Sequence, residues 1–228
     1  MIATRMPEKI TISLNTKESV TGIVYSSPPR KRMKVTFLLA HGAGTDQTSD
    51  FMVSFASGLA SRGLDAITFN FPYTEQKRGV PDRNDRLEEC YRSVINSILT
   101  RKKFKDTRLV IGGKSMGGRI ASQIAAGIDE LTNLVFLGYP LHPPGKPDQL
   151  RIDHLPRVGK PMLFVQGTRD PFGTPDELRP IIKRLKLKAE IYEIEGGDHS
   201  FKVPKKMGLS QEELYSNAQA AIVEWISL

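Results

Sequence analysis

Short apolar segments alternate with helical patterns along most of this chain, and that alternation restricts the possible folds more than any other feature. Most of the segments are continuously apolar, which is typical of strands covered on both faces. Two early segments, at residues 9–14 and 20–25, predict an opening hairpin. Later segments predict strands at residues 35–40, 66–71, 108–113, 134–139, 161–167 and 189–194.

The intervals between these segments carry amphipathic helical patterns. Phe51, Phe55 and Leu59 recur every four residues, and Gly63 behind them is a typical helix end. Residues 87–98 carry a second apolar stripe at helical spacing. Both intervals therefore predict helices that pack one face against a sheet.

Two more helices are predicted by their N-terminal signals. Thr174 and Ser210 each stand three residues before a glutamate, which is the spacing of a capping box. Pro180 leaves the length of the first of these helices open. The last helix carries Trp225 on its apolar face, so this side chain is predicted to lie in the core.

Strands that alternate with helices imply crossover connections and a mostly parallel sheet. We therefore expect an α/β fold, a three-layer α/β/α sandwich around a mostly parallel sheet. A chain of 228 residues can bury one substantial core, so residues 1–228 are expected to form a single domain.

The formal net charge of +8 is scattered along the chain rather than concentrated in one motif. A basic surface can attract anionic substrates, membranes or nucleic acid. Because no nucleic-acid-binding motif accompanies the charge, we expect solvated loops and helix faces and no nucleic-acid partner.

Cys90 is the one cysteine in the sequence, which excludes an intrachain disulfide and a cysteine-based zinc site. The first ten residues lack the apolar core of a signal peptide, and no apolar run is long enough to span a membrane. These features favour a cytoplasmic protein without a membrane anchor.

Ligands of such α/β folds bind beyond the carboxyl ends of the strands, so the residues there are the candidates for chemistry. Ser115 lies in the sequence Gly113-Lys114-Ser115-Met116-Gly117, where a predicted strand gives way to a predicted helix. This G-x-S-x-G pattern is typical of a strained turn that exposes a nucleophilic serine. The glycines would relieve collisions on either side of the serine.

An acid and a histidine follow at later strand ends. Asp170 comes after the segment 161–167, and His199 comes after the segment 189–194. The chain order Ser, Asp, His is that of the α/β-hydrolase triad. Asp176 and Asp198 are alternative acids, although Asp176 fits a helix N-terminus better and Asp198 is adjacent to the histidine.

The remaining histidines have other expected roles. His41 is expected to hold the shape of its loop, whereas His142 and His154 lie in a proline-rich segment and are expected at the surface or at a pocket wall.

Two backbone amides, those of Met116 and Ala43, are candidates for an oxyanion hole. An alternative for the Ala43 segment is a plain flexible turn, since glycine is common in turns. Substrate contacts are predicted for a set of residues that follow strands, namely Gly42, Tyr73, Tyr139, Leu141 and His142.

The combination of HGAG, GGKSMGG, GTRDP and GGDHSF on one chain resembles the α/β-hydrolase superfamily. Within it, the chain is similar to the small serine hydrolases related to the testis-expressed-protein and dienelactone-hydrolase-like groups. The resemblance extends from about Val20 to the last helix. It implies a Ser115-Asp170-His199 triad and hydrolysis of an acyl ester or a related bond. Dienelactone hydrolases use a cysteine nucleophile, so Ser115 argues against that particular activity.

The expected function is thus a serine hydrolase, a carboxylesterase acting on a small ester through an acyl-enzyme, without a metal or an organic cofactor. A thioesterase or short-peptide hydrolase would use the same residues. A non-enzymatic scaffold of the same fold that binds a protein partner is the alternative from another class.

A large cap domain is not expected. The segment from Pro140 to Lys160, where many hydrolases of this fold insert a helical cap, has 21 residues and five prolines. An open site with a preference for short acyl chains follows from this expectation.

Overall fold

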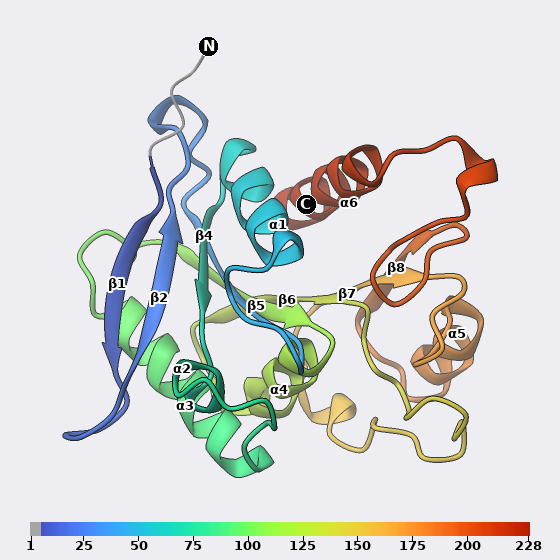
Figure 1. Ribbon diagram of the computed structural model, residues 1–228, viewed down its shortest axis with the longest axis horizontal. Helices are drawn as coiled ribbons and strands as arrows, with labels where there is room; N and C mark the ends of the chain where they lie inside the picture. The colour runs from blue at the N-terminus through green and yellow to red at the C-terminus, as the bar shows by residue number, and fades with distance from the viewer. Residues whose placement is uncertain (1–5) are drawn as a thin grey trace.

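The structure is a computed structural model that describes residues 6–228. Its centre is one eight-stranded sheet with the strand order β1-β2-β4-β3-β5-β6-β7-β8 (Figure 1). The first two pairs, β1 with β2 and β2 with β4, are antiparallel, and all the later neighbours are parallel. The strands are β1 Glu8–Ser13, β2 Ser19–Tyr25, β3 Val35–Ala40, β4 Asp65–Phe69, β5 Arg108–Lys114, β6 Leu131–Leu137, β7 Met162–Gly167 and β8 Ala189–Ile194.

Helices cover both faces of this sheet. The helices are α1 Asp50–Ser61, α2 Pro72–Glu75, α3 Asn84–Leu99, α4 Met116–Ile124, α5 Pro175–Arg184 and α6 Gln211–Ser227. Buried residues of α1 and α6 belong to one apolar cluster, and those of α3, α4 and α5 belong to another. The predicted three-layer α/β/α sandwich is confirmed.

Strand β3 shows how the sequence produces the two clusters. All six of its residues are buried, but successive side chains point to opposite faces. Leu38 and Ala40 join the cluster under α3 and α4, whereas Phe37 and Leu39 join the cluster under α1 and α6. A continuous apolar run is therefore the pattern that a doubly covered strand requires.

The predicted helix starts are confirmed. Thr174 and Ser210 form capping boxes with Glu177 and Glu213. Trp225 packs against the apolar cluster under α1 and α6, but it is half-buried at the edge of this cluster, and its indole N–H donates to Glu190 Oε1 at 2.8 Å. The polar edge of the indole keeps this side chain at the rim of α6.

The segment between β6 and β7 contains no large cap. Within residues 140–160 the structure has a single short 3₁₀ turn, Leu155–Arg157, and otherwise irregular chain. Among residues 6–228, no helix combines the length and apolar character needed to cross a membrane. The expectation about the first ten residues depends in part on residues 1–5, which lie outside the described residues.

Candidate active site

Ser115 occupies a strained turn between β5 and α4. Its backbone has φ 50° and ψ −115°, and non-glycine residues rarely adopt such a conformation. A Cβ on Gly113 or on Gly117 would collide with the carbonyl oxygen of Ala40. Both positions must therefore be glycine for the turn to pack against β3. The backbone N–H of Ser115 donates to the Leu137 carbonyl at 3.0 Å. These contacts hold the serine at the carboxyl end of the sheet.

His199 connects Ser115 to an acid through both ring nitrogens. Its Nδ1 lies 2.7 Å from Asp170 Oδ2, and its Nε2 lies 2.9 Å from Ser115 Oγ. A carboxylate can only accept, so Nδ1 carries the proton and Nε2 accepts from the serine hydroxyl. Asp170 follows β7 and His199 follows β8, which places the three side chains at one edge of the sheet.

The Asp170 carboxylate is buried and held on both oxygens. Oδ1 accepts from the Phe172 N–H at 2.9 Å, and Oδ2 also accepts from Gln166 Nε2 at 2.9 Å. These donors fix the carboxylate facing His199. Gln166 is a supporting residue that the strand pattern of β7 hides in the sequence.

The two alternative acids lie elsewhere. Asp198 Oδ1 accepts from the backbone N–H groups of Ser200 and Lys202, at 2.7 and 2.9 Å, and thereby shapes the loop of His199. Asp176 is exposed at the start of α5. Asp170 is therefore the acid that the structure brings to His199.

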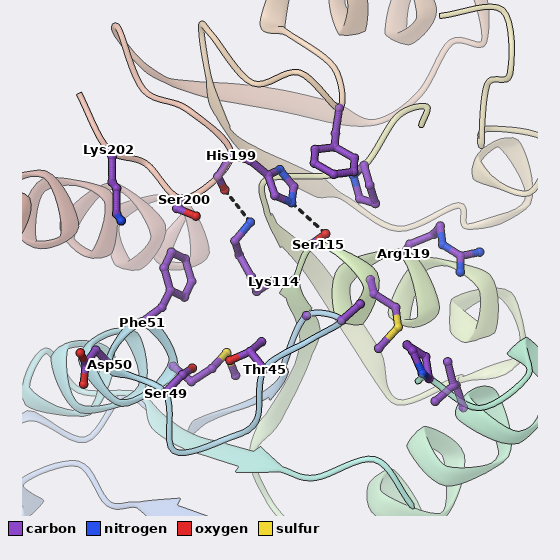
Figure 2. Close-up of a pocket in the computed structure, with 18 of the residues that line it drawn as sticks. Thr45, Ser49, Asp50, Phe51, Lys114, Ser115, Arg119, His199, Ser200 and Lys202 are labelled. Carbon is purple, nitrogen blue, oxygen red and sulfur yellow. Dashed lines mark hydrogen bonds between the residues drawn. The ribbon is translucent and has the colours of Figure 1, made fainter. Parts of the chain in front are cut away.

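Lys114, the residue before the serine, is almost fully buried beside this array. Its Nζ donates to the backbone carbonyl of His199 at 2.5 Å, as Figure 2 shows. The ammonium also lies over the rings of Phe51 and Phe201. Burial lowers the pKa of Lys114 to about 8, although Asp170 and nearby Asp198 favour the charged form. The sequence pattern does not single out Lys114, because it occupies a variable position of G-x-S-x-G.

The two candidate oxyanion amides are free to bind a ligand. Neither the Met116 N–H nor the Ala43 N–H donates to another group in the described chain. No side chain caps the first turn of α4, whose N-terminus carries a partial positive charge next to Ser115. Gly42 lies against the serine, because a Cβ there would be 3.5 Å from Ser115 Cβ.

A cavity of about 920 Å³ opens at Ser115. It lies between residues of the β3–α1 loop, the start of α3, the start of α4 and the loops after β6, β7 and β8. Its lining includes Gly42, Ala43, Asp50, Phe51, Asp82, Asn84, Lys114, Ser115, Met116, Arg119, Pro140, Arg151, Phe172, His199 and Lys202.

The predicted substrate contacts need a correction, because four of the five side chains are buried away from this lining. Tyr139 packs on Phe136 and donates from its hydroxyl to the Arg151 carbonyl at 2.8 Å. Tyr73, Leu141 and His142 are likewise buried. Bulky side chains at strand ends gain more free energy in the core than at an open wall. Gly42 is the one predicted contact that lines the cavity.

The other histidines have structural contacts. His41 is buried, with Nδ1 2.8 Å from the Gly42 carbonyl and Nε2 accepting from the Phe71 N–H at 3.2 Å. Burial lowers its pKa, which keeps the ring neutral between its two loops. His154 bonds to Ser122 Oγ at 2.7 Å, and burial lowers its pKa to about 4. His41 thus holds its loop as predicted.

Comparison with known proteins identifies a matching family and several solved structures with the same fold. A family described as alpha/beta hydrolase domain matches residues 33–227. A serine hydrolase without a lid from Xanthomonas campestris is 19% identical, with a TM-score of 0.75, over 96% of this chain and 94% of its own. Dienelactone hydrolase from Anabaena variabilis is 18% identical, with a TM-score of 0.76, over 98% of both chains. An esterase from Pyrococcus furiosus is 13% identical, with a TM-score of 0.74, over 97% of this chain and 90% of its own.

Proposed function

Because the chain belongs to the α/β-hydrolase family, we propose that it is a serine hydrolase that cleaves small carboxylic esters through an acyl-enzyme. The observation that carries this proposal is the hydrogen-bonded array from Ser115 through His199 to Asp170 at a strained turn. Nucleophile, base and orienting acid lie within hydrogen-bond reach of one another, which is the geometry that acyl transfer needs.

In the proposed reaction, His199 Nε2 takes the proton of Ser115 as the hydroxyl oxygen attacks the ester carbonyl. Asp170 holds the imidazole in the required tautomer and stabilises the imidazolium that forms. The Met116 and Ala43 amides donate to the oxyanion of the tetrahedral intermediate. His199 then protonates the leaving alcohol, and water attacks the acyl-enzyme by the same route.

This scheme uses the chain's own side chains and amides for every step. A serine at position 115 argues against dienelactone hydrolysis as the particular activity. A thioester or a short peptide could enter the same mechanism. The single cysteine, Cys90, suits a reducing compartment such as the cytoplasm, where we place this activity.

Hydrolysis of p-nitrophenyl acetate and butyrate by purified protein tests the proposal. We expect turnover by the wild type and a loss of at least about a thousandfold in kcat for Ser115→Ala, because removing a nucleophile leaves only the binding contributions to catalysis. Ser57→Ala, an exposed serine of α1, is the matched control and should retain full activity. A wild type without turnover of esters, thioesters or short peptides would favour the scaffold function instead.

A further inference from the structure

The cavity at Ser115 carries an excess of positive charge. Lys114, Arg119, Arg151 and Lys202 line it, together with two carboxylates, Asp50 and Asp82. Asp82 is already neutralised, since its Oδ1 lies 2.6 Å from an Arg78 nitrogen. Lys114 is engaged with the His199 carbonyl, and Lys202 is exposed to solvent. The two arginines are therefore the half-buried cations of the lining, and within residues 6–228 they form no ion pair with a carboxylate.

Arg119 is placed beside Ser115 by the geometry of α4. It lies four residues after the serine, and its backbone N–H donates to the Ser115 carbonyl at 3.1 Å. Helical side chains lean toward the N-terminus of their helix, so Arg119 covers the turn that holds the nucleophile. Figure 2 shows Arg119 and Lys114 on opposite sides of Ser115. Arg119 Nη2 donates to the neutral Asn84 Oδ1 at 2.9 Å, and this bond orients the guanidinium without neutralising it.

Arg151 reaches the cavity from the segment between β6 and β7. Its N–H donates to the Leu141 carbonyl at 2.8 Å, and its carbonyl accepts from the Tyr139 hydroxyl at 2.8 Å. These two bonds fix its backbone to the end of β6. The guanidinium itself has one long contact, from Nη1 to the Pro140 carbonyl at 3.5 Å. The short segment that replaces a cap thus delivers a cation to the site.

The two guanidinium groups influence each other unfavourably. Burial, and then the neighbouring charge of Arg151, lowers the pKa of Arg119. Glu88 acts in the opposite direction, but its Oε1 accepts from Asn84 Nδ2 at 3.1 Å. Within residues 6–228, neither guanidinium forms an ion pair with a carboxylate. Two partly buried like charges cost stability unless an anion binds between them.

We propose that Arg119 and Arg151 form a binding site for an anionic group of the substrate, so that the enzyme prefers esters that carry a carboxylate or phosphate. This inference rests on the proposed function, because the anion is recognised beside the nucleophile Ser115. The guanidinium fork matches the paired oxygens of either oxyanion. Neutral esters of the same size leave the two cations unpaired and bind more weakly.

Pairs of substrates that differ only in charge test the preference. Monoethyl glutarate and ethyl glutaramate place a carboxylate or a carboxamide on the acyl side, and acetoxyacetate and acetoxyacetamide do the same on the alcohol side. In at least one pair, we expect kcat/KM of the anion to exceed that of the amide by about tenfold or more, mainly through KM. Charge-assisted hydrogen bonds of this kind are roughly twice as strong as neutral ones.

Variants connect the preference to the two residues. Arg119→Gln and Arg151→Gln should bring the anion-to-amide ratio toward one, because each lowers kcat/KM of the anion more than that of the amide. Arg119→Lys should retain part of the ratio, because it keeps the charge but loses the fork. Arg108→Gln, at the opposite end of β5, removes the same charge far from the site and should leave the ratio unchanged.

Protection against a neutral fluorophosphonate separates this inference from the proposed function. Glutarate or glycerol phosphate should slow the labelling of Ser115 in the wild type, and the more effective of the two identifies the preferred oxyanion. Protection should weaken in Arg119→Gln and in Arg151→Gln. Normal labelling, with no protection by either anion and a ratio of one in both substrate pairs, overturns the anion site and leaves the serine mechanism intact. Absence of labelling overturns the serine mechanism, and the anion site with it.

Discussion

Asp170 follows β7, whereas Asp198 belongs to the loop of His199 itself, and the two carboxylates have different partners. Asp170 faces His199 Nδ1, whereas Asp198 accepts from backbone amides through one oxygen. An asparagine retains that single acceptor oxygen, but it cannot act as a carboxylate toward an imidazole. The two positions therefore offer a matched pair of substitutions.

We expect Asp170→Asn to lower kcat by several orders of magnitude and Asp198→Asn to lower it by less than about threefold. In the serine-protease example, the equivalent change costs about 10⁴ because the histidine adopts the wrong tautomer. Steady-state kinetics on p-nitrophenyl acetate measures both. The reverse ranking would assign the orienting role to Asp198.

The buried Lys114 side chain makes the free energy of unfolding depend on pH in the alkaline range. In the folded chain burial lowers its pKa to about 8, whereas an unfolded lysine titrates near about 10.4. Between these values the unfolded state holds the proton that the folded state has released, so this group adds stability as pH rises. Below about pH 8 both states are protonated and the cost of the buried charge is fully present.

Urea unfolding of the wild type and of Lys114→Met at pH 7 and pH 10.5 measures this effect. The difference between the free energies of unfolding, wild type minus variant, should increase by on the order of 3 kcal/mol from pH 7 to pH 10.5. Comparing the two proteins cancels the other titrating groups. A difference that is independent of pH would mean that Lys114 titrates normally in the folded chain.

The residues of the candidate site differ in how far the sequence alone could predict them. Ser115, Asp170 and His199 could be found because each follows a strand, and the carboxyl ends of parallel strands meet at one edge. Arg119 and Arg151 could not be found, because their proximity depends on how the segment after β6 folds back. The same limit explains Tyr139, whose place at a strand end does not reveal that its ring turns into the core.

At the scale of elements, a single tyrosine joins α3 to the two central strands. The buried hydroxyl of Tyr91 lies 2.7 Å from the Leu38 carbonyl and 2.8 Å from the Gly112 carbonyl, and it accepts from the Gly112 N–H at 3.1 Å. It thus satisfies backbone groups of β3 and β5 just before the turn that carries the nucleophile.

Tyr91→Phe should lower the free energy of unfolding by about 1–3 kcal/mol, because it leaves buried backbone groups without a partner. Tyr192→Phe is the control, since this half-buried hydroxyl of β8 forms no hydrogen bond within the described chain, and it should change stability by less than about 0.5 kcal/mol. Chemical denaturation compares them. Equal effects would mean that the Tyr91 bonds contribute nothing beyond the lost hydroxyl.

The strands could be predicted from the sequence, but the residues at which they begin could not. The eight predicted strands all exist, but β6 begins at Leu131, three residues before its first continuously apolar residue. Its early residues Thr132 and Asn133 are half-buried, so polar side chains are tolerated there. Local apolar runs locate a strand, whereas pairing with its neighbours determines where it starts.

At the scale of the whole molecule, the missing cap leaves the cavity at Ser115 open to solvent. Each methylene that a pocket buries is worth about 0.8 kcal/mol, or roughly a fourfold gain in kcat/KM. Because the cavity is open, a long acyl chain bound in it would stay partly exposed to water, so added methylenes would gain less than this.

With p-nitrophenyl esters from C2 to C16, kcat/KM should stop rising after a few carbons. Activity should also show no jump above the micellar concentration of the substrate. A steady rise to C12 or C16 would indicate that a movable segment or a partner subunit completes an acyl tunnel.

The proposed mechanism depends on Ser115 as the covalent nucleophile, and mass spectrometry of the fluorophosphonate adduct identifies that residue. We expect one adduct per chain, located by peptide mapping on Ser115, and no adduct on Ser115→Ala at the same dose. Labelling should be slowed strongly by His199→Ala, because the hydroxyl loses its base. An adduct on another residue, or equal labelling of Ser115→Ala, would rule out Ser115 as the nucleophile.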